Sequence, residues 1–251
     1  KVTGGALPRD FAQVVEFGGG TGDNAALLRE LRFSGVHLVV DLPEVLLLQQ
    51  YFLSLAQWPV FSYLERDLHR LETQSVDNTT APGVGVGVDG SPVTVADATA
   101  SVSDIPSNSQ STLLVHDVAL LRAKYDHSVS DRTLLWATFS LSESPVAVRA
   151  QILDRYFNYG TIFLTLQNDF DGLDNIEWLS ELARDLRGEY HCCLWKDMPK
   201  SEGFMQVNVF VARKVHLGLL ECNHEAGCNP NTVLFCNDYQ SELGRGLRLE
   251  Q

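Results

Sequence analysis

The sequence has little positive charge, no long apolar run and no Cys-x-x-Cys pair. Its 19 Lys and Arg residues stand against 32 Asp and Glu, which gives a formal net charge of −13 over 251 residues. A surface this acidic repels phosphate backbones, so we expect no nucleic acid partner. The most apolar stretch, residues 45–61, is interrupted by Gln49, Gln50, Gln57 and Pro59. A membrane span needs about 20 apolar residues, so we expect no membrane partner either.

The cysteine pattern argues against a metal centre and against a disulfide framework. The five cysteines are Cys192, Cys193, Cys222, Cys228 and Cys236. Their number is odd and their spacing scattered, which favours a reducing compartment, and we expect a cytoplasmic protein. Cys222, His224, Cys228 and Cys236 could in principle hold a metal, but no pair has the Cys-x-x-Cys spacing of a zinc knuckle. We therefore expect ordinary cysteines and no metal.

The chain is expected to be one domain spanning residues 1–251. It begins at Lys1 with strand-like sequence close behind, so we expect that an N-terminal region is missing. Residues 73–111 contain no Lys or Arg and are rich in Gly, Ser, Thr and Asp, which predicts a mobile insertion. Residues 214–251 are expected to form a C-terminal extension.

Short β-branched runs alternate with amphipathic helical segments from residue 13 onward. Strands are predicted at residues 13–17, 36–40, 112–117, 133–139, 161–166, 190–195 and 205–212, with 232–236 as an added edge strand. Helices are predicted at residues 23–33, 42–56, 144–157 and 174–186. The two late strands have no helix between them. The pattern predicts an α/β fold with a Rossmann-like sheet, mostly parallel with a late antiparallel strand and helices on both faces.

A glycine loop follows the first predicted strand and precedes the first predicted helix. It contains Glu16, Gly18, Gly19, Gly20 and Gly22. Glycines there let the backbone turn sharply and let a ligand lie against bare peptide. We therefore expect a valine at position 18 or 20 to abolish ligand binding while leaving the fold largely intact.

The same loop argues against other nucleotides. The dinucleotide pattern G-x-G-x-x-G would require glycine where Asp23 stands, and that charge would face a pyrophosphate at the helix N-terminus. The Walker pattern is absent as well. Asp41 follows the second predicted strand, where a carboxylate can accept hydrogen bonds from both ribose hydroxyls. Asp41 could also cap the helix that begins near Pro43, and the two roles are compatible.

The pattern E-x-G-x-G-x-G with Asp41-Leu42-Pro43 resembles class I S-adenosylmethionine-dependent methyltransferases. The segment from Trp136 to Pro145, with its Ser-x-x-Glu motif, is similar to the sugar O-methyltransferase family. The resemblance covers about residues 11–213. It implies S-adenosyl-L-methionine as cofactor, bound by the glycine loop, Asp41 and Leu42. It also implies methyl transfer to a hydroxyl of a small molecule, with a sugar or glycan as a candidate acceptor.

The residues that act on the acceptor are less well defined. Glu143 is the first candidate for the general base, although an acid there could equally favour a helix N-terminus. His116 is the second candidate. Two segments, residues 95–98 and 116–117, compete for the end of the third strand, and Asp97 is preferred for the adenine contact.

Ser140, Ser142 and Glu143 are expected to line the acceptor floor. Asn168 and Asp169 are expected farther along the same rim.

Two other functions remain open at this stage. An NAD(P)-dependent oxidoreductase is disfavoured by Asp23 and by the absence of a Tyr-x-x-x-Lys pair. A non-catalytic cofactor-binding domain would keep the fold without an organised acceptor pocket. The sequence does not define the oligomeric state.

Overall fold

The computed structural model describes residues 10–62, 111–195, 207–218 and 233–236. Asp97 lies outside the described residues, as do Cys222, His224, Cys228 and almost all of the predicted insertion.

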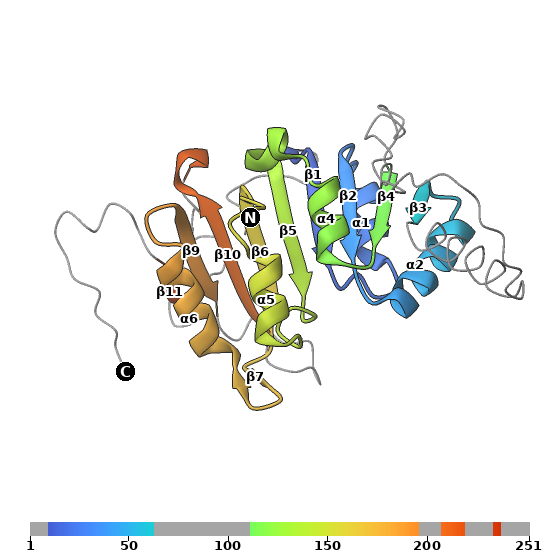
Figure 1. Cartoon of the computed structure of the whole chain (residues 1–251). Helices are drawn as coiled ribbons and strands as arrows, with labels where there is room; N and C mark the ends of the chain where they lie inside the picture. The colour runs from blue at the N-terminus through green and yellow to red at the C-terminus, as the bar shows by residue number, and fades with distance from the viewer. Residues whose placement is uncertain (1–9, 63–110, 196–206, 219–232, 237–251) are drawn as a thin grey trace, which may run out of the picture.

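Eleven strands are described, and nine of them form one sheet (Figure 1). Across the sheet the order is β11-β9-β10-β6-β5-β1-β2-β4-β3. These strands are β1 Gln13–Phe17, β2 Val36–Val40, β3 Val60–Ser62, β4 Ser111–Val115, β5 Thr133–Thr138, β6 Thr161–Leu166, β9 Tyr190–Trp195, β10 Asn208–Lys214 and β11 Val233–Cys236. The six neighbouring strands β6, β5, β1, β2, β4 and β3 are parallel. Strand β10 lies between β6 and β9 and is antiparallel to both. The predicted mostly parallel sheet with a late antiparallel strand is confirmed.

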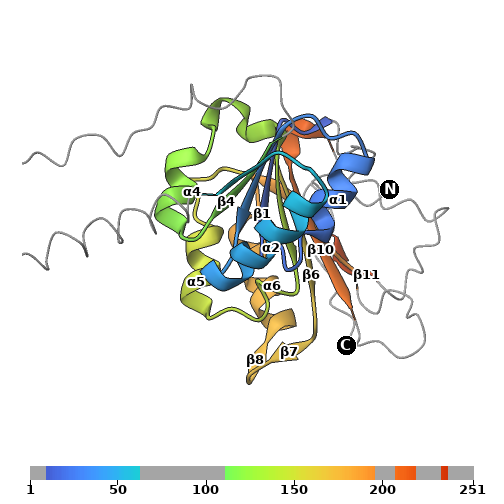
Figure 2. The ribbon, with the colours of Figure 1, turned by 90° about the vertical axis from the view of Figure 1, so that its right-hand side faces the viewer.

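Five α-helices are described, and they flank the sheet on two sides. They are α1 Asp23–Glu30, α2 Pro43–Leu55, α4 Val118–Lys124, α5 Val146–Ile152 and α6 Asn175–Asp185. Figure 2 shows α4, α5 and α6 on one side of the sheet and α1 on the other. Short 3-10 helices span His127–Arg132 and Val215–Leu217, and β7 Asp169–Phe170 pairs with β8 Leu173–Asp174 in a small hairpin.

Alternation along the strands produces a core on each side of the sheet. On β2, Leu38 and Val40 pack into the large cluster that also contains Leu121, Ile152 and Leu179 of α4, α5 and α6. Their neighbour Val39 points the other way and packs with Leu46 of α2 and Leu114. A third cluster joins Val14 to Leu28 of α1. Burial on both faces explains why these strands read as continuous apolar runs.

The structure resolves the ambiguity about the third strand. The strand beside β2 is β4, so residues 111–115 occupy that place, and His116 and Asp117 follow the end of this strand. The edge strand predicted at 232–236 is confirmed as β11. Helix α4 was not predicted. It is only seven residues long and follows its N-cap Asp117, whose Oδ1 accepts a hydrogen bond from the Leu120 amide at 2.6 Å.

The expectation about the cysteines was wrong in one respect. Cys193 is disulfide-bonded, whereas Cys192 is buried and not part of a disulfide. Spacing along the chain does not reveal which cysteines distant strands bring together, and the odd count misled for that reason. The cysteine count therefore no longer supports a cytoplasmic location. In the described part of the chain, no helix combines the length and apolar character needed to cross a bilayer.

Candidate functional site

The candidate site lies at the carboxyl ends of β1, β2 and β5. The chain leaves β1 for β2 on one side and returns to β5 on the other, so the strand order reverses beside β1. In open α/β sheets such a reversal leaves a crevice beyond the carboxyl ends of the strands. The glycine loop, Asp41 and the segment after β5 all meet there.

The glycine loop is held in a conformation that requires glycine. Gly18, Gly20 and Gly22 have φ values of +75°, +54° and +91°, in the left-handed region that side chains disfavour. The Gly22 amide donates to the Gly19 carbonyl at 2.9 Å, and Gly22 then serves as the N-cap of α1. A Cβ at position 20 would meet no heavy atom within 4 Å. The loop therefore exposes bare backbone to open space at Gly20.

Gly18 has a different role from Gly20. A Cβ at position 18 would lie 2.0 Å from the Cβ of Ser140, the second residue after β5. The Ser140 hydroxyl donates a hydrogen bond to the Phe17 carbonyl, so this close approach joins the ends of β1 and β5. The fold itself needs glycine at position 18, and the expectation that valine there would leave the fold intact must be revised.

Asp41 points at the glycine loop. Its Oδ2 accepts from the Gly20 amide at 3.2 Å and its Oδ1 from the Leu42 amide at 2.8 Å. Burial raises the pKa of the Asp41 carboxyl and nearby Glu16 adds to that effect, while hydrogen bonds from Leu42, Gly20 and Gly19 oppose it. Leu42 is 66% exposed on the same rim. The Asp41 carboxylate is therefore positioned to contact a ligand bound on the glycine loop.

Glu16 supports the loop from below. Its side chain is 1% exposed, with Oε1 accepting from Asn24 Nδ2 at 2.7 Å and Oε2 lying 2.8 Å from His37 Nε2. His37 Nδ1 in turn lies 3.3 Å from Thr112 Oγ1. Both carboxylate oxygens of Glu16 are therefore engaged within the protein, and a direct contact with a cofactor would require this network to rearrange. The pattern E-x-G-x-G-x-G did not reveal this buried network.

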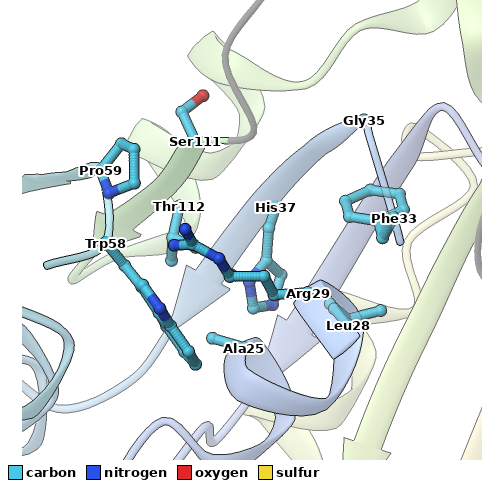
Figure 3. Close-up of a pocket in the computed structure, with 10 residues that line it drawn as sticks. All are labelled: Ala25, Leu28, Arg29, Phe33, Gly35, His37, Trp58, Pro59, Ser111 and Thr112. Carbon is cyan, nitrogen blue, oxygen red and sulfur yellow. The ribbon is translucent and has the colours of Figure 1, made fainter. Parts of the chain in front are cut away.

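The far end of this network borders a small cavity. Figure 3 shows His37 and Thr112 beside Arg29 and Trp58, in a cavity of about 30 Å³. The Arg29 guanidinium lies 5.2 Å from the centre of the Trp58 ring. Because His37 and Thr112 are each the second residue of their strands, this cavity lies toward the amino ends of β2 and β4, away from the glycine loop.

The chain turns tightly as it leaves β5. Phe139 has φ +63°, and the Ser140 amide donates to the Thr138 carbonyl at 2.7 Å. This is a γ-turn, a strained geometry that persists only where the surroundings hold it. The Phe139 amide also donates to Thr165 at 2.8 Å, which joins the turn to β6. The turn delivers the following residues to the rim of the site.

The predicted acceptor residues differ in what they can contact. The hydroxyls of Ser140 and Ser142 donate to the carbonyls of Phe17 and Phe139, and Ser142 is 2% exposed. Neither hydroxyl is directed to a ligand in this arrangement. Glu143 is exposed, and its side chain makes no hydrogen bond or ion pair with the described residues. Of the three, Glu143 is the one available to an acceptor.

Arg149 of α5 holds this turn, and sequence reasoning missed it. The guanidinium is 1% exposed and donates to the carbonyls of Ser142 at 2.5 Å and Ser144 at 2.8 Å. It also donates to Asn175 Oδ1 at 2.8 Å and lies 4.6 Å from the Trp178 ring centre. Burial lowers the pKa of Arg149. Its contacts bracket Glu143 on both sides, so the arginine fixes the backbone that presents this carboxylate.

The remaining predicted residues lie on either side of β1. His116 follows β4, and its Nε2 lies 3.4 Å from Asp117 Oδ2. It is therefore two strands from β1 on the side of Asp41, whereas Glu143 follows β5 on the opposite side. Asn168 and Asp169 follow β6 and line a cavity of about 430 Å³ with the β7–β8 hairpin. Asp97, the predicted adenine contact, is outside the described residues.

No protein-family model matches the sequence, and no curated protein matches it. Several solved structures resemble the fold. The methyltransferase domain of bacterial CtHen1 has a TM-score of 0.47 at 11% identity, covering 81% of this chain and 91% of that one. An rRNA methylase from Streptococcus thermophilus has a TM-score of 0.44 at 12% identity, covering 84% and 92%.

A magnesium protoporphyrin IX methyltransferase from Synechocystis PCC 6803, with SAH bound, has a TM-score of 0.39 at 11% identity, covering 80% and 73%. Chains at this distance can carry different chemistry, so the function is argued from the residues of this chain.

Proposed function

We propose that this protein is an S-adenosylmethionine-dependent methyltransferase. The observation that carries the proposal is the pairing of Asp41 with the glycine loop. The Asp41 carboxylate lies 3.2 Å from the Gly20 amide, where it can accept hydrogen bonds from ribose hydroxyls. The glycine backbone beside it faces open space and offers a surface for the amino-acid end of the cofactor.

The charge of the loop favours this cofactor over a dinucleotide. Asp23 opens α1 and accepts a hydrogen bond from Thr21 Oγ1 at 3.1 Å, so a carboxylate already occupies the helix N-terminus where a pyrophosphate would bind. Asp41 and Glu16 add further negative charge close by. A sulfonium and an α-amino group are both cationic, and they would be attracted by the field that repels phosphate.

The methyl acceptor is a hydroxyl of a small molecule, with a sugar as the first candidate. The Ser-x-x-Glu segment after β5 supports this inference, and the structure leaves Glu143 free on that rim. Asp169 supplies carboxylate oxygens that can accept hydrogen bonds from further hydroxyls, on the cavity beside β6, whereas the Asn168 side-chain oxygen already accepts from Asn208 Nδ2 at 2.8 Å.

In the proposed reaction the protein aligns the acceptor and removes its proton. The bound cofactor supplies an electrophilic methyl group on a sulfonium. The glycine loop and Asp41 would hold this cofactor, whose methyl carbon would be the electrophile for the acceptor oxygen, with the S–C bonding pair left on sulfur. Glu143 takes the hydroxyl proton as general base, and Arg149 fixes the turn that holds Glu143. The position of His116 beyond β2 makes it the weaker candidate for this step.

Calorimetric titration with S-adenosylmethionine, S-adenosylhomocysteine and NADH tests the assignment. We expect binding of the first two and no binding of NADH. Asp41→Ala should weaken binding by about 1–3 kcal/mol, the scale of lost charge-assisted hydrogen bonds, and Asp41→Asn by less. A matched control is Asp126→Ala, because Asp126 also accepts local hydrogen bonds, from the Ser128 amide and hydroxyl, but precedes β5 at its amino end.

Each result has a distinct meaning. Failure of the wild-type protein to bind either methyl-donor ligand contradicts the proposal. Binding of NADH instead favours an oxidoreductase. Cofactor binding without methyl transfer to any member of a panel of sugars and other hydroxylated compounds identifies a non-catalytic binding domain.

A further inference from the structure

A fully buried glutamine lies directly beneath the glycine loop. Gln49 stands on the inner face of α2, in line with Leu46 and Leu53, and it is 0% exposed. Neither its Oε1 nor its Nε2 has a hydrogen-bond partner in the described part of the chain. Buried amides are almost always hydrogen-bonded, since burial removes their water without replacing it. This side chain therefore requires an explanation that packing does not supply.

The amide is packed against the loop itself. A Cβ at Gly19 would lie 2.2 Å from Gln49 Nε2 and 2.8 Å from Val39 Cγ1. Gln49 Cγ would also be 3.7 Å from a Cβ at Gly22. The Gly19 residue is buried, whereas its neighbour Gly20 is exposed. The loop is thus a single layer of backbone between the Gln49 amide and the open space where the cofactor is proposed to bind.

On its exposed side, the glycine loop is held by a long hydrogen bond. The Gly20 amide reaches Asp41 Oδ2 at 3.2 Å, the long end of the range for such bonds. A ribose whose hydroxyls donate hydrogen bonds to Asp41 would compete with the Gly20 amide for the same oxygen. The loop peptides could then shift toward Gln49, which offers two donor hydrogens and an acceptor oxygen within the protein.

We propose that Gln49 is a positioning residue for cofactor binding: its amide is unsatisfied in the free protein and hydrogen-bonds the glycine-loop backbone when the cofactor binds and the loop peptides shift toward α2. This inference rests on the proposed function. It predicts opposite effects of one substitution. Removing the amide relieves the free protein of an unsatisfied buried group and deprives the bound state of its hydrogen bonds.

The test compares Gln49→Met with Leu46→Met. Both replace a fully buried residue on the same face of α2 with a flexible apolar side chain, but only the first removes an amide. We expect Gln49→Met to melt about 2–6 °C above the wild-type protein without ligand, the size of shift that a relieved buried polar group gives in a chain of this length. We expect its affinity for S-adenosylhomocysteine to fall at least about tenfold. Leu46→Met should melt slightly lower and bind normally.

Two results would overturn the inference while the proposed function stands. In the first, Gln49→Met is no more stable than the wild-type protein, which would show that the amide is satisfied in the free state. Alternatively, Gln49→Met is more stable and binds with unchanged affinity, which would show that the bound state does not use the amide. Failure of the wild-type protein to bind S-adenosylhomocysteine is a separate result that removes the proposed function together with this inference.

Discussion

Two glycines of the same loop should lose different amounts of stability on substitution. At position 20 an alanine Cβ would meet nothing within 4 Å, so Gly20→Ala carries only the strain of its positive φ, about 1 kcal/mol. At position 18 the same strain applies, and the new Cβ would also lie 2.0 Å from Ser140 Cβ and 2.2 Å from its Oγ. Forcing apart a packed contact costs roughly 1–3 kcal/mol more.

Urea unfolding measures this difference directly. We expect Gly18→Ala to lose about 2–4 kcal/mol of unfolding free energy, the sum of strain and overpacking, and Gly20→Ala about 1 kcal/mol. The second substitution Ser140→Gly should restore part of the stability of Gly18→Ala and none of that of Gly20→Ala, because only position 18 touches the serine. Equal losses at the two positions, or no coupling to Ser140, would refute the reasoning.

Ligand binding provides a second test of position 20. Gly20→Val should stay folded and lose S-adenosylmethionine binding, since its side chain would fill the space above the loop. Gly188→Val is the matched control. Gly188 also has a positive φ, +88°, and open space around it, but it precedes β9 at the opposite end of the sheet. A folded Gly20→Val that binds normally would show that the cofactor does not lie on this part of the loop.

Four further outcomes are expected. Glu143→Gln should lower methyl transfer by about a hundredfold or more with little change in S-adenosylmethionine affinity, measured as S-adenosylhomocysteine formed; equal losses in both would remove it from the base role. Arg149→Met should cost about 3 kcal/mol of stability in urea, since it leaves three buried acceptors without their donor. Asp174→Ala should cost about 1 kcal/mol, because Asp174 Oδ1 caps α6 through two backbone amides; no loss would show that water replaces the cap. Lys214 and His216 lower the pKa of Asp131, so this carboxylate adds stability above about pH 4 that is lost as the pH falls through its lowered pKa. Asp131→Asn should therefore make the urea midpoint less dependent on pH in the acid range. An unchanged pH dependence would contradict the pairing of Asp131 with Lys214 and His216.

The fold could be read from the sequence because its strands and helices carry strong local patterns. Val14, Val15, Val39 and Val40 lie in short β-branched runs, and Gly22 and Pro43 mark helix starts. Asp41 could be placed because the carboxyl end of a strand beside the loop leaves a side chain few other directions. Its contact with Gly20 is observed, whereas its role toward ribose stays a prediction.

What the sequence could not supply were contacts between distant segments. Gly18 and Ser140 are 122 positions apart, and only the paired ends of β1 and β5 bring them together. The engagement of Glu16 by His37 depends in the same way on the register of two parallel strands. Nothing in the sequence singled out Arg149, because two of its acceptors are carbonyls of a turn that has no sequence signature. Glycine and acid patterns thus located the site, but not the interior that supports it.

The position of β10 has a consequence for how the chain is synthesised. Strand β10 pairs with both β6 and β9. The facing edges of β6 and β9 therefore lack a hydrogen-bonded partner strand until residues 208–214 have emerged from the ribosome. The strands from β1 to β6 can assemble earlier, since each pairs with a partner made before residue 167. In the interval the growing chain exposes unpaired, apolar strand edges of the kind that promote aggregation. A protein shortened to end before Asn208 would keep that edge permanently, while retaining every residue of the glycine loop.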